Sequence, residues 1–211
     1  MHSRIFFWTA LTVICLAIFS SCGVVPKNAP ANKPFVFKYN ITVNGNFSTE
    51  EKTRLKTRLA NQLDDSIKVR AARKFLYKGI NRPVLVKPPV YESANADRSV
   101  IYMKALLKSL GYFNDTITYK ATIDTLAGNE LRTTVDFQVT PGKVVRIDSF
   151  AYNIKQPELQ SLATKEPGLI KKGDPFAKSA ISAELDRLVL IYRNNGYMRF
   201  GREELIGLWD T

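Results

Sequence analysis

The chain has 211 residues, of which 45% are hydrophobic and 24% are charged, and its formal net charge is +12. This composition is ordinary for a folded protein and provides enough apolar material for one large core or two small ones. The excess of Lys and Arg favours an anionic neighbour such as a membrane surface, lipopolysaccharide or nucleic acid.

The first residues have the pattern of a bacterial export signal. Arg4 provides a positive charge, and the run from Ile5 to Phe19 is largely apolar and uncharged. This run is too short for a typical membrane-spanning helix, and small residues and Cys22 follow it directly. We therefore expect a lipoprotein signal peptide over residues 1–21 and lipidation (palmitate) of Cys22. The alternative is an ordinary signal peptide in which Cys22 has no special role.

Removal of this signal would also remove His2, the only His, and Cys15. The mature chain would keep Cys22 as its only Cys, which excludes an internal disulfide and a His- or Cys-rich metal site. The sequence also contains no phosphate-binding glycine loop and no serine-hydrolase motif. We therefore predict no cofactor, no metal and no enzymatic activity.

A Pro-rich tether over residues 22–34 precedes the first predicted elements and behaves as an extended spacer. Alternation of apolar and polar residues then predicts a half-buried strand from Phe35 to Val43. Ser48 and Glu51 have the spacing of a capping box. Leucines at helical spacing after this box predict a helix from about residue 49 to residue 66.

The next stretch, from Lys68 to Arg82, is basic and poorly patterned. We interpret it as an inserted loop, with at most a short strand at residues 84–86, because the prolines around it break any helix. A second helix is predicted over residues 94–110. It ends at Gly111, which can adopt a positive φ at low steric cost.

A β-hairpin is predicted after this helix. Tyr112 would open its first strand, which runs through Ile123, and Gly128 with Asn129 would form the turn. Alternating apolar residues predict the second strand over residues 131–139.

The same order of elements then restarts. We expect a strand over residues 145–147, a short helix that begins at Pro157, and a longer helix over residues 177–195. Gly196 would end this helix, and Tyr197 would open a strand.

The two halves contain near-copies of one pattern at a constant offset of 85 positions. The matching pairs are Lys87 and Lys172, Tyr91 and Phe176, Val100 and Leu185, Met103 and Leu188, Leu107 and Tyr192, Gly111 and Gly196, and Tyr112 and Tyr197. Such a repeat predicts two domains of one kind, over residues 35–142 and 143–211, the second without its last strand. We expect the chain to be the N-terminal part of a longer protein or a shortened gene product.

Five short motifs carry a family resemblance, in the order Ser109–Phe113, Val139–Gly142, Ile147–Ser149, Lys172–Phe176 and Tyr192–Tyr197. This ordered set resembles the POTRA domains of BamA/TamA-type outer-membrane assembly proteins. With Cys22, the chain is most similar to the lipoprotein form of the translocation and assembly module. The resemblance covers about residues 35–211, and the family's C-terminal β-barrel has no counterpart in it.

The resemblance implies an α+β fold of tandem β-α-α-β-β units that face the periplasm from a lipid anchor in the outer membrane. It also implies that outer-membrane protein clients or assembly components bind by β-augmentation, in which an extended chain pairs with an exposed sheet edge. The candidate edge is one of the strands over residues 35–43 and 113–123. Its outward face would carry Thr116, Thr118, Lys120 and Thr122.

Other groups of residues have alternative interpretations. A basic tract could hold anionic lipid headgroups or be a solvated loop, and it contains Lys68, Arg70, Arg73, Lys74, Lys78 and Arg82. The alternative function is a free-standing basic envelope protein that binds an anionic polymer or membrane surface, with neither nucleic acid nor a small-molecule substrate as partner. We interpret Asp64 and Asp65 as surface charges. Four aromatic residues are predicted to lie in the core, namely Tyr91, Tyr112, Phe176 and Tyr197.

Overall fold

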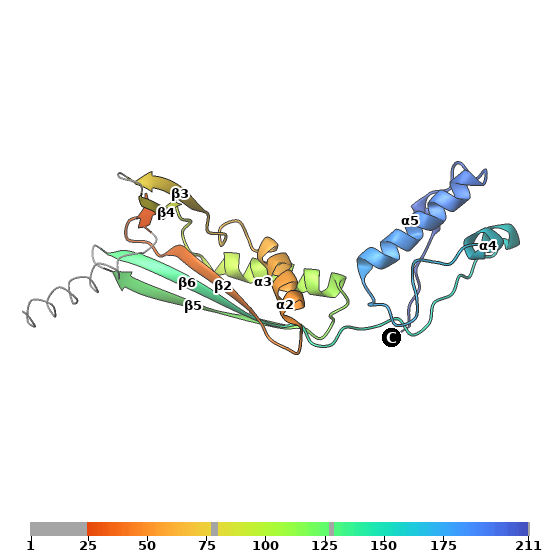
Figure 1. Cartoon of the computed structure of the whole chain (residues 1–211), viewed down its shortest axis with the longest axis horizontal. Helices are drawn as coiled ribbons and strands as arrows, with labels where there is room; N and C mark the ends of the chain where they lie inside the picture. The colour runs from red at the N-terminus through yellow and green to blue at the C-terminus, as the bar shows by residue number, and fades with distance from the viewer. Residues whose placement is uncertain (1–24, 77–79, 127–128, 211) are drawn as a thin grey trace, which may run out of the picture. The chain divides into compact units, whose positions relative to one another are not determined.

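The computed structural model describes residues 25–76, 80–126 and 129–210 (Figure 1). In chain order its elements are β1 (Val25–Lys27), β2 (Phe35–Val43), α2 (Thr49–Asn61), β3 (Ala71–Leu76), β4 (Ile80–Val86), α3 (Ser93–Ser109), β5 (Thr116–Leu126), β6 (Glu130–Thr140), α4 (Pro157–Thr164), α5 (Lys178–Asn194) and the 3₁₀ helix η1 (Arg202–Glu204). The strands form two three-stranded sheets, with orders β1-β4-β3 and β2-β6-β5. The α+β class is therefore confirmed, and β2-α2-α3-β5-β6 has the expected β-α-α-β-β order.

The chain forms two compact units. Among the described residues, unit 1 consists of residues 25–40, 63–76, 80–99, 119–126 and 129–137, and unit 2 consists of residues 41–62, 100–118 and 138–210. In the described part of the chain, no helix is long and apolar enough to span a membrane.

Helix α2 begins at the predicted capping box. The Glu51 N–H donates to Ser48 Oγ at 3.2 Å, and the Ser48 N–H donates to a Glu51 carboxylate oxygen at 3.0 Å. The helix ends at Asn61, five residues earlier than predicted. A turn replaces its last residues because the Asp64 carboxylate accepts the Ser66 N–H at 2.9 Å.

The predicted loop over residues 68–82 is wrong, because β3 and β4 form an antiparallel hairpin there. Pro83 argued against a strand, since proline lacks the N–H that a ladder needs. However, the described residues of β1 pair with β4 at Val84 to Val86 and not at Pro83. The prediction of an extended tether over residues 22–34 is wrong in part for the same reason. Residues 25–27 form β1, which pairs in parallel with β4. The missed β1–β4 pairing joins residues far apart in the sequence, whereas the missed β3–β4 hairpin joins near neighbours such as Leu76 and Ile80.

The predicted β5–β6 hairpin is present, but its first strand begins and ends later than predicted. Strand β5 begins at Thr116, whereas Tyr112 forms only an isolated antiparallel bridge with Val144. Part of the predicted turn, Gly128, lies outside the described residues. Strand β6 buries one face, which consists of Thr133, Val135, Phe137 and Val139.

The repeated Gly-Tyr pairs terminate α3 and α5 in the same way. Gly111 donates its N–H to Lys108 O at 3.1 Å, and Tyr112 donates to Leu107 O at 3.0 Å. The same two bonds recur 85 positions later. Gly196 donates its N–H to Arg193 O at 3.3 Å, and Tyr197 donates to Tyr192 O at 3.1 Å. These pairs of bonds define Schellman motifs, and the two glycines have φ values of +92° and +98°. The repeat is therefore local structure as well as sequence.

The backbone bridge that precedes each of these helices is also repeated. Phe35 forms an antiparallel bridge with Val90, and Arg146 forms one with Pro175, again 85 positions after Val90. The predicted strand over residues 145–147 is reduced to this bridge and its flanking hydrogen bonds. Gly173 donates an additional N–H to Ile147 O at 2.7 Å, which its counterpart Pro88 cannot do because proline has no N–H.

Helices α4 and α5 pack against each other within unit 2 around a buried cluster of Leu159, Ala163, Leu188 and Tyr192. The predicted strand after Tyr197 is wrong, because a turn and then η1 follow. The Phe200 ring lies 4.6 Å from the Tyr192 ring, and Arg193 Nε donates to Phe200 O at 2.8 Å. These contacts fold the segment back onto α5, and the described residues 141–210 contain no strand.

Candidate protein-binding edge

Strand β5 is the outer strand of its sheet, where β6 is its neighbour. It contains eleven residues, and about half of its backbone groups point away from the neighbouring strand in such a position. In the parts of the chain that the structure describes, no further strand covers this side.

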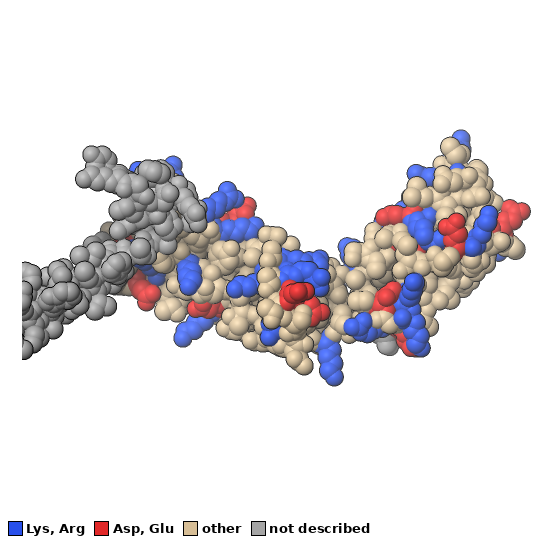
Figure 2. Space-filling model, viewed as in Figure 1, with Lys and Arg blue, Asp and Glu red and all other residues tan. Residues whose placement is uncertain are grey.

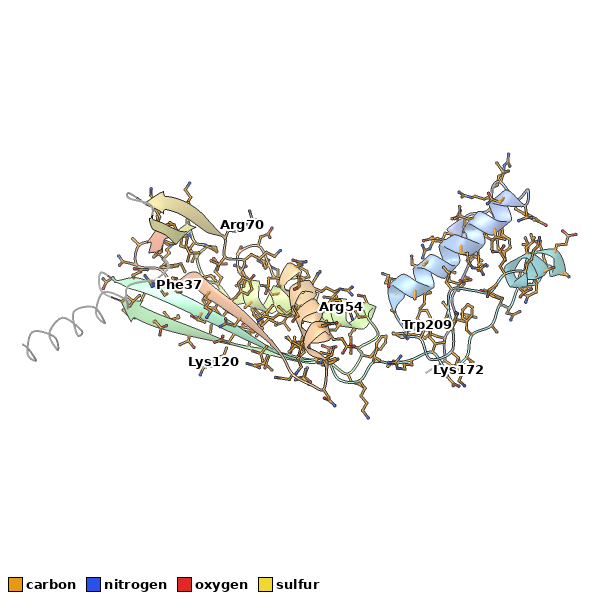
Figure 3. All side chains as sticks on the ribbon, viewed as in Figure 1. Phe37, Arg54, Arg70, Lys120, Lys172 and Trp209 are labelled. Atoms are coloured by element: carbon orange, nitrogen blue, oxygen red, sulfur yellow. The ribbon has the colours of Figure 1, made fainter. Side chains whose placement is uncertain are left out.

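The predicted outward face of β5 is solvent-exposed. Thr116, Thr118, Lys120 and Thr122 are all exposed and alternate along the strand. Figure 3 shows Lys120 extending outward from the β5–β6 ribbon. These hydroxyl and ammonium groups keep a free edge soluble, and Lys on such an edge discourages uncontrolled strand pairing.

The opposite face of β5 is attached to the core at Tyr119. Its ring lies 5.7 Å from the Phe137 ring, and its hydroxyl donates to Asp97 Oδ1 at 2.9 Å. Burial, together with this hydrogen bond to a carboxylate, raises the pKa of Tyr119 to about 12. The phenol therefore stays protonated at neutral pH and holds the strand in place without carrying charge.

The far half of β5 departs from the sequence prediction. Ile123 was expected to continue the apolar face but is 49% exposed, and Leu126 is 43% exposed. From Thr122 to Leu126 every residue is exposed, so the strand continues beyond the region that buries its inner face. The alternation of apolar and polar residues could not reveal this exposure. Ile123 continues the alternation whether or not core residues pack against that part of the strand.

The other candidate edge, β2, is partly occupied. The Val36 N–H donates to Pro89 O at 2.9 Å, and the Tyr91 N–H donates to Pro34 O at 2.8 Å. The segment at residues 89–91 thus pairs with the start of β2, where Phe35 and Val36 are fully buried. This pairing favours β5 over β2 as the edge that could accept another chain.

The predicted basic tract is spread over the segment before β3 and over the β3–β4 hairpin. Lys68 pairs with Asp65 at 3.2 Å, whereas Arg70 is exposed beside the start of β3 (Figure 3). Arg73 and Lys74 belong to β3, and Arg82 is opposite Lys74 on β4. Lys78 lies outside the described residues, as does the expected lipidation site Cys22.

Asp64 is more than the surface charge that the sequence predicted. Its carboxylate accepts the Ser66 N–H and also the Arg98 Nε–H at 3.0 Å, and its backbone N–H donates to Ser99 Oγ. The backbone hydrogen bond from Ser66, supported by Arg98, lowers the pKa of this carboxyl. The neighbouring Asp65 is exposed, in agreement with the prediction.

Gly111 and Gly196 share a backbone conformation but not an environment. A Cβ on Gly111 would lie 3.0 Å from Phe176 O and 3.2 Å from Val144 Cγ2, whereas nothing lies within 4 Å of a Cβ on Gly196. The Tyr residues that follow them, and also Tyr91 and Phe176, are half-buried rather than fully buried. These junction residues have a structural role: they end helices and pack against neighbouring side chains. They do not belong to the candidate edge on β5.

Among the side chains whose burial the structure describes, the most buried charged group is Glu184 on α5, which is 2% exposed. Its carboxylate accepts hydrogen bonds from Tyr152 Oη at 2.5 Å, the Leu169 N–H at 2.6 Å and Arg187 Nη2 at 2.6 Å. Burial would raise the pKa of Glu184, but these donors outweigh it and lower the pKa. Because its hydrogen bonds are all to neighbouring segments of unit 2, we interpret this group as structural.

The described residues contain no group of three or more His, Cys, Asp or Glu side chains that could hold a metal ion. Two cavities of about 800 and 720 Å³ lie in unit 2, beside α5 and beside the ring of Phe176. The apolar side chains in the walls of the second cavity include Phe113, Phe150 and Trp209.

No protein-family model and no curated protein matches the chain. Among solved structures, the crystal structure of Haemophilus influenzae BamA POTRA3-5 is similar to it at 10% sequence identity, with a TM-score of 0.25. The match covers 83% of this chain and 90% of that chain. A likeness at this level gives no support to a shared function.

Proposed function

We propose that this protein is an interaction module that binds extended polypeptide segments by strand addition to the outer edge of β5. One observation carries the proposal. An eleven-residue outer strand has an exposed polar face, and no described strand pairs with its free side. An incoming strand would bond to the free backbone groups of β5, so binding would depend weakly on the client's side chains.

We also propose the setting in which this module works. The motifs that resemble POTRA domains, together with the apolar run before Cys22, support a lipid-anchored, periplasm-facing protein that takes part in outer-membrane protein assembly. Its clients would be outer-membrane proteins in extended form or components of the assembly machinery. Metabolic labelling with an alkyne-bearing fatty acid tests the anchor, because Cys22→Ser should lose a label that the natural chain acquires.

Hydrogen exchange tests strand addition directly. Addition of an unfolded outer-membrane protein should protect outward-facing amides over Thr116–Leu126, because each gains a carbonyl partner. Amides of α4 serve as an internal reference, since no strand edge lies there. Binding without any new protection in β5 would contradict the proposal.

Photo-crosslinking provides a second test with a matched control. A photoreactive residue at Thr118 should form a covalent adduct with the same client, whereas one at Thr164 on α4 should not. Both threonines are exposed, so a photoreactive side chain at either position is accessible to a client in solution. Equal adduct formation at the two positions would indicate contact without strand pairing.

A further inference from the structure

Helix α2 carries an unusual concentration of positive charge. Between Lys52 and Asn61 it contains no acidic residue, and its four cations are Lys52, Arg54, Lys56 and Arg58. All four are exposed, and none forms an ion pair among the described residues. Figure 2 shows blue side chains gathered over this helix.

Helical geometry arranges these cations in two rows. Leu55 and Leu59 are buried and define the inner side of α2. At 3.6 residues per turn, Lys52 and Lys56 lie along one flank, and Arg54 and Arg58 lie along the other. The outermost line between the two rows is neutral and consists of Thr53 and Thr57, whose hydroxyls donate to the carbonyls of Thr49 and Thr53 at 2.8 and 2.9 Å.

The acidic residues of α2 are confined to its first turn, at Glu50 and Glu51. Glu51 is already engaged, because its carboxylate accepts the Ser48 N–H. This backbone hydrogen bond lowers the pKa of Glu51, and the charge of nearby Arg54 contributes least to the shift. The two acids therefore complement the helix N-terminus and leave the later cations without partners.

The two rows contain like charges at positions i and i+4, which is unfavourable for an isolated helix. Lys52 faces Lys56 in one row, and Arg54 faces Arg58 in the other. An external layer of negative charge would replace this repulsion by attraction. The long apolar stems of Lys and Arg can lie along the helix and direct their charged ends outward to such a layer.

The shape of this surface indicates the class of anion. Neither of the two cavities described above is lined by α2 residues, and the four cations lie in open rows on an exposed helix surface. The helix also carries no aromatic side chain on which a base could stack. A plane of lipid headgroups, in contrast, can meet both rows at once. We infer that α2 is a docking surface for anionic phospholipid bilayers.

This docking surface uses residues separate from those of strand addition at β5, so either proposal can fail alone. The test uses the full chain and vesicles of phosphatidylcholine with or without phosphatidylglycerol. Vesicles of phosphatidylcholine alone measure the contribution of the apolar N-terminal run, which every variant retains. The α2 variant carries Lys52→Gln, Arg54→Gln, Lys56→Gln and Arg58→Gln.

A matched control removes the same amount of charge elsewhere in unit 2. Lys143, Lys155, Lys165 and Arg199 are exposed and form no ion pair among the described residues, and each is replaced by Gln. At physiological salt we expect the α2 variant to lose about tenfold or more in partitioning to phosphatidylglycerol vesicles. The control should lose less than about twofold, because its charges lie outside the docking surface.

Equal losses in both variants would show a net-charge effect and overturn the inference, as would unchanged partitioning of the α2 variant. Tighter α2-dependent binding to single-stranded DNA than to the vesicles would also overturn it. A variant with Lys52→Arg and Lys56→Arg should retain binding, since it keeps the charge. Circular dichroism spectra and melting curves of all variants establish that the fold is unchanged, because Gln is a good helix former.

Discussion

At the scale of single residues, two glycines adopt the same backbone conformation in different surroundings. Gly111 and Gly196 both end helices with positive φ, but only Gly111 is closely surrounded. A side chain at either position adopts a left-handed conformation at a cost of about 1–2 kcal/mol. At Gly111 a Cβ would also press on the Phe176 carbonyl and on Val144.

We therefore expect Gly196→Ala to lower the free energy of unfolding by about 1 kcal/mol and Gly111→Ala to lower it by about 3 kcal/mol, because crowding adds to the conformational strain. Urea denaturation followed by circular dichroism measures both. Equal losses would mean that the surroundings of Gly111 relax at no cost.

The buried Glu184 predicts a pH dependence. Hydrogen bonds lower its pKa in the folded protein. A depressed folded pKa means that the carboxylate contributes stability above its unfolded pKa and loses this contribution as pH falls through the folded value. The natural chain should therefore lose stability in acid, below about pH 4.

Glu184→Gln should remove this part of the pH dependence while lowering the free energy of unfolding by about 2–3 kcal/mol at neutral pH, because Arg187 loses a charged partner. Denaturation curves at neutral and acidic pH, for both chains, measure the difference. If the curves of the natural chain and the variant shift in parallel, Glu184 does not contribute to acid sensitivity.

At the scale of elements, helix ends follow from local hydrogen bonding. The capping box of α2 and the Schellman motifs of α3 and α5 use residues within a few positions of each other. Strand pairing instead joined β1 to β4, a contact across more than fifty residues that no local pattern indicated.

For α2 we expect Ser48→Ala to lower the free energy of unfolding by about 1 kcal/mol, since the Glu51 N–H loses its acceptor. Ser48→Asp serves as the control and should restore most of this stability, because Asp is an equally good N-cap residue. Thermal melts of the three proteins provide the comparison. An alanine variant as stable as the natural chain would show that the box contributes little.

For the whole molecule, the net charge of +12 predicts sensitivity to ionic strength. Like charges repel in the compact state, and salt screens this repulsion over about 10 Å at 0.1 M. The urea midpoint should therefore rise from low salt to physiological salt. A fall would mean that screening weakens favourable ion pairs, such as Arg202 with Asp186 at 2.7 Å, more than it relieves repulsion.

The amino-acid sequence by itself determined the local features of this protein. Ser48 and Glu51, the glycines at 111 and 196, and the alternation over residues 35–43 and 131–139 each predicted an element that the structure contains. These features depend on neighbours within a few positions or on one repeating period, so the sequence contains the whole signal.

Only the tertiary structure decided which strands pair and which edges stay free. Residues 71–86 form a hairpin, Ile123 extends beyond the core, and the segment after Tyr197 folds onto α5 instead of forming a strand. Each outcome depends on which segments pack together in three dimensions, and the repeating pattern within one segment does not specify this packing. The candidate edge on β5 is of this kind, because an edge is free only when the surrounding chain provides no neighbour for it.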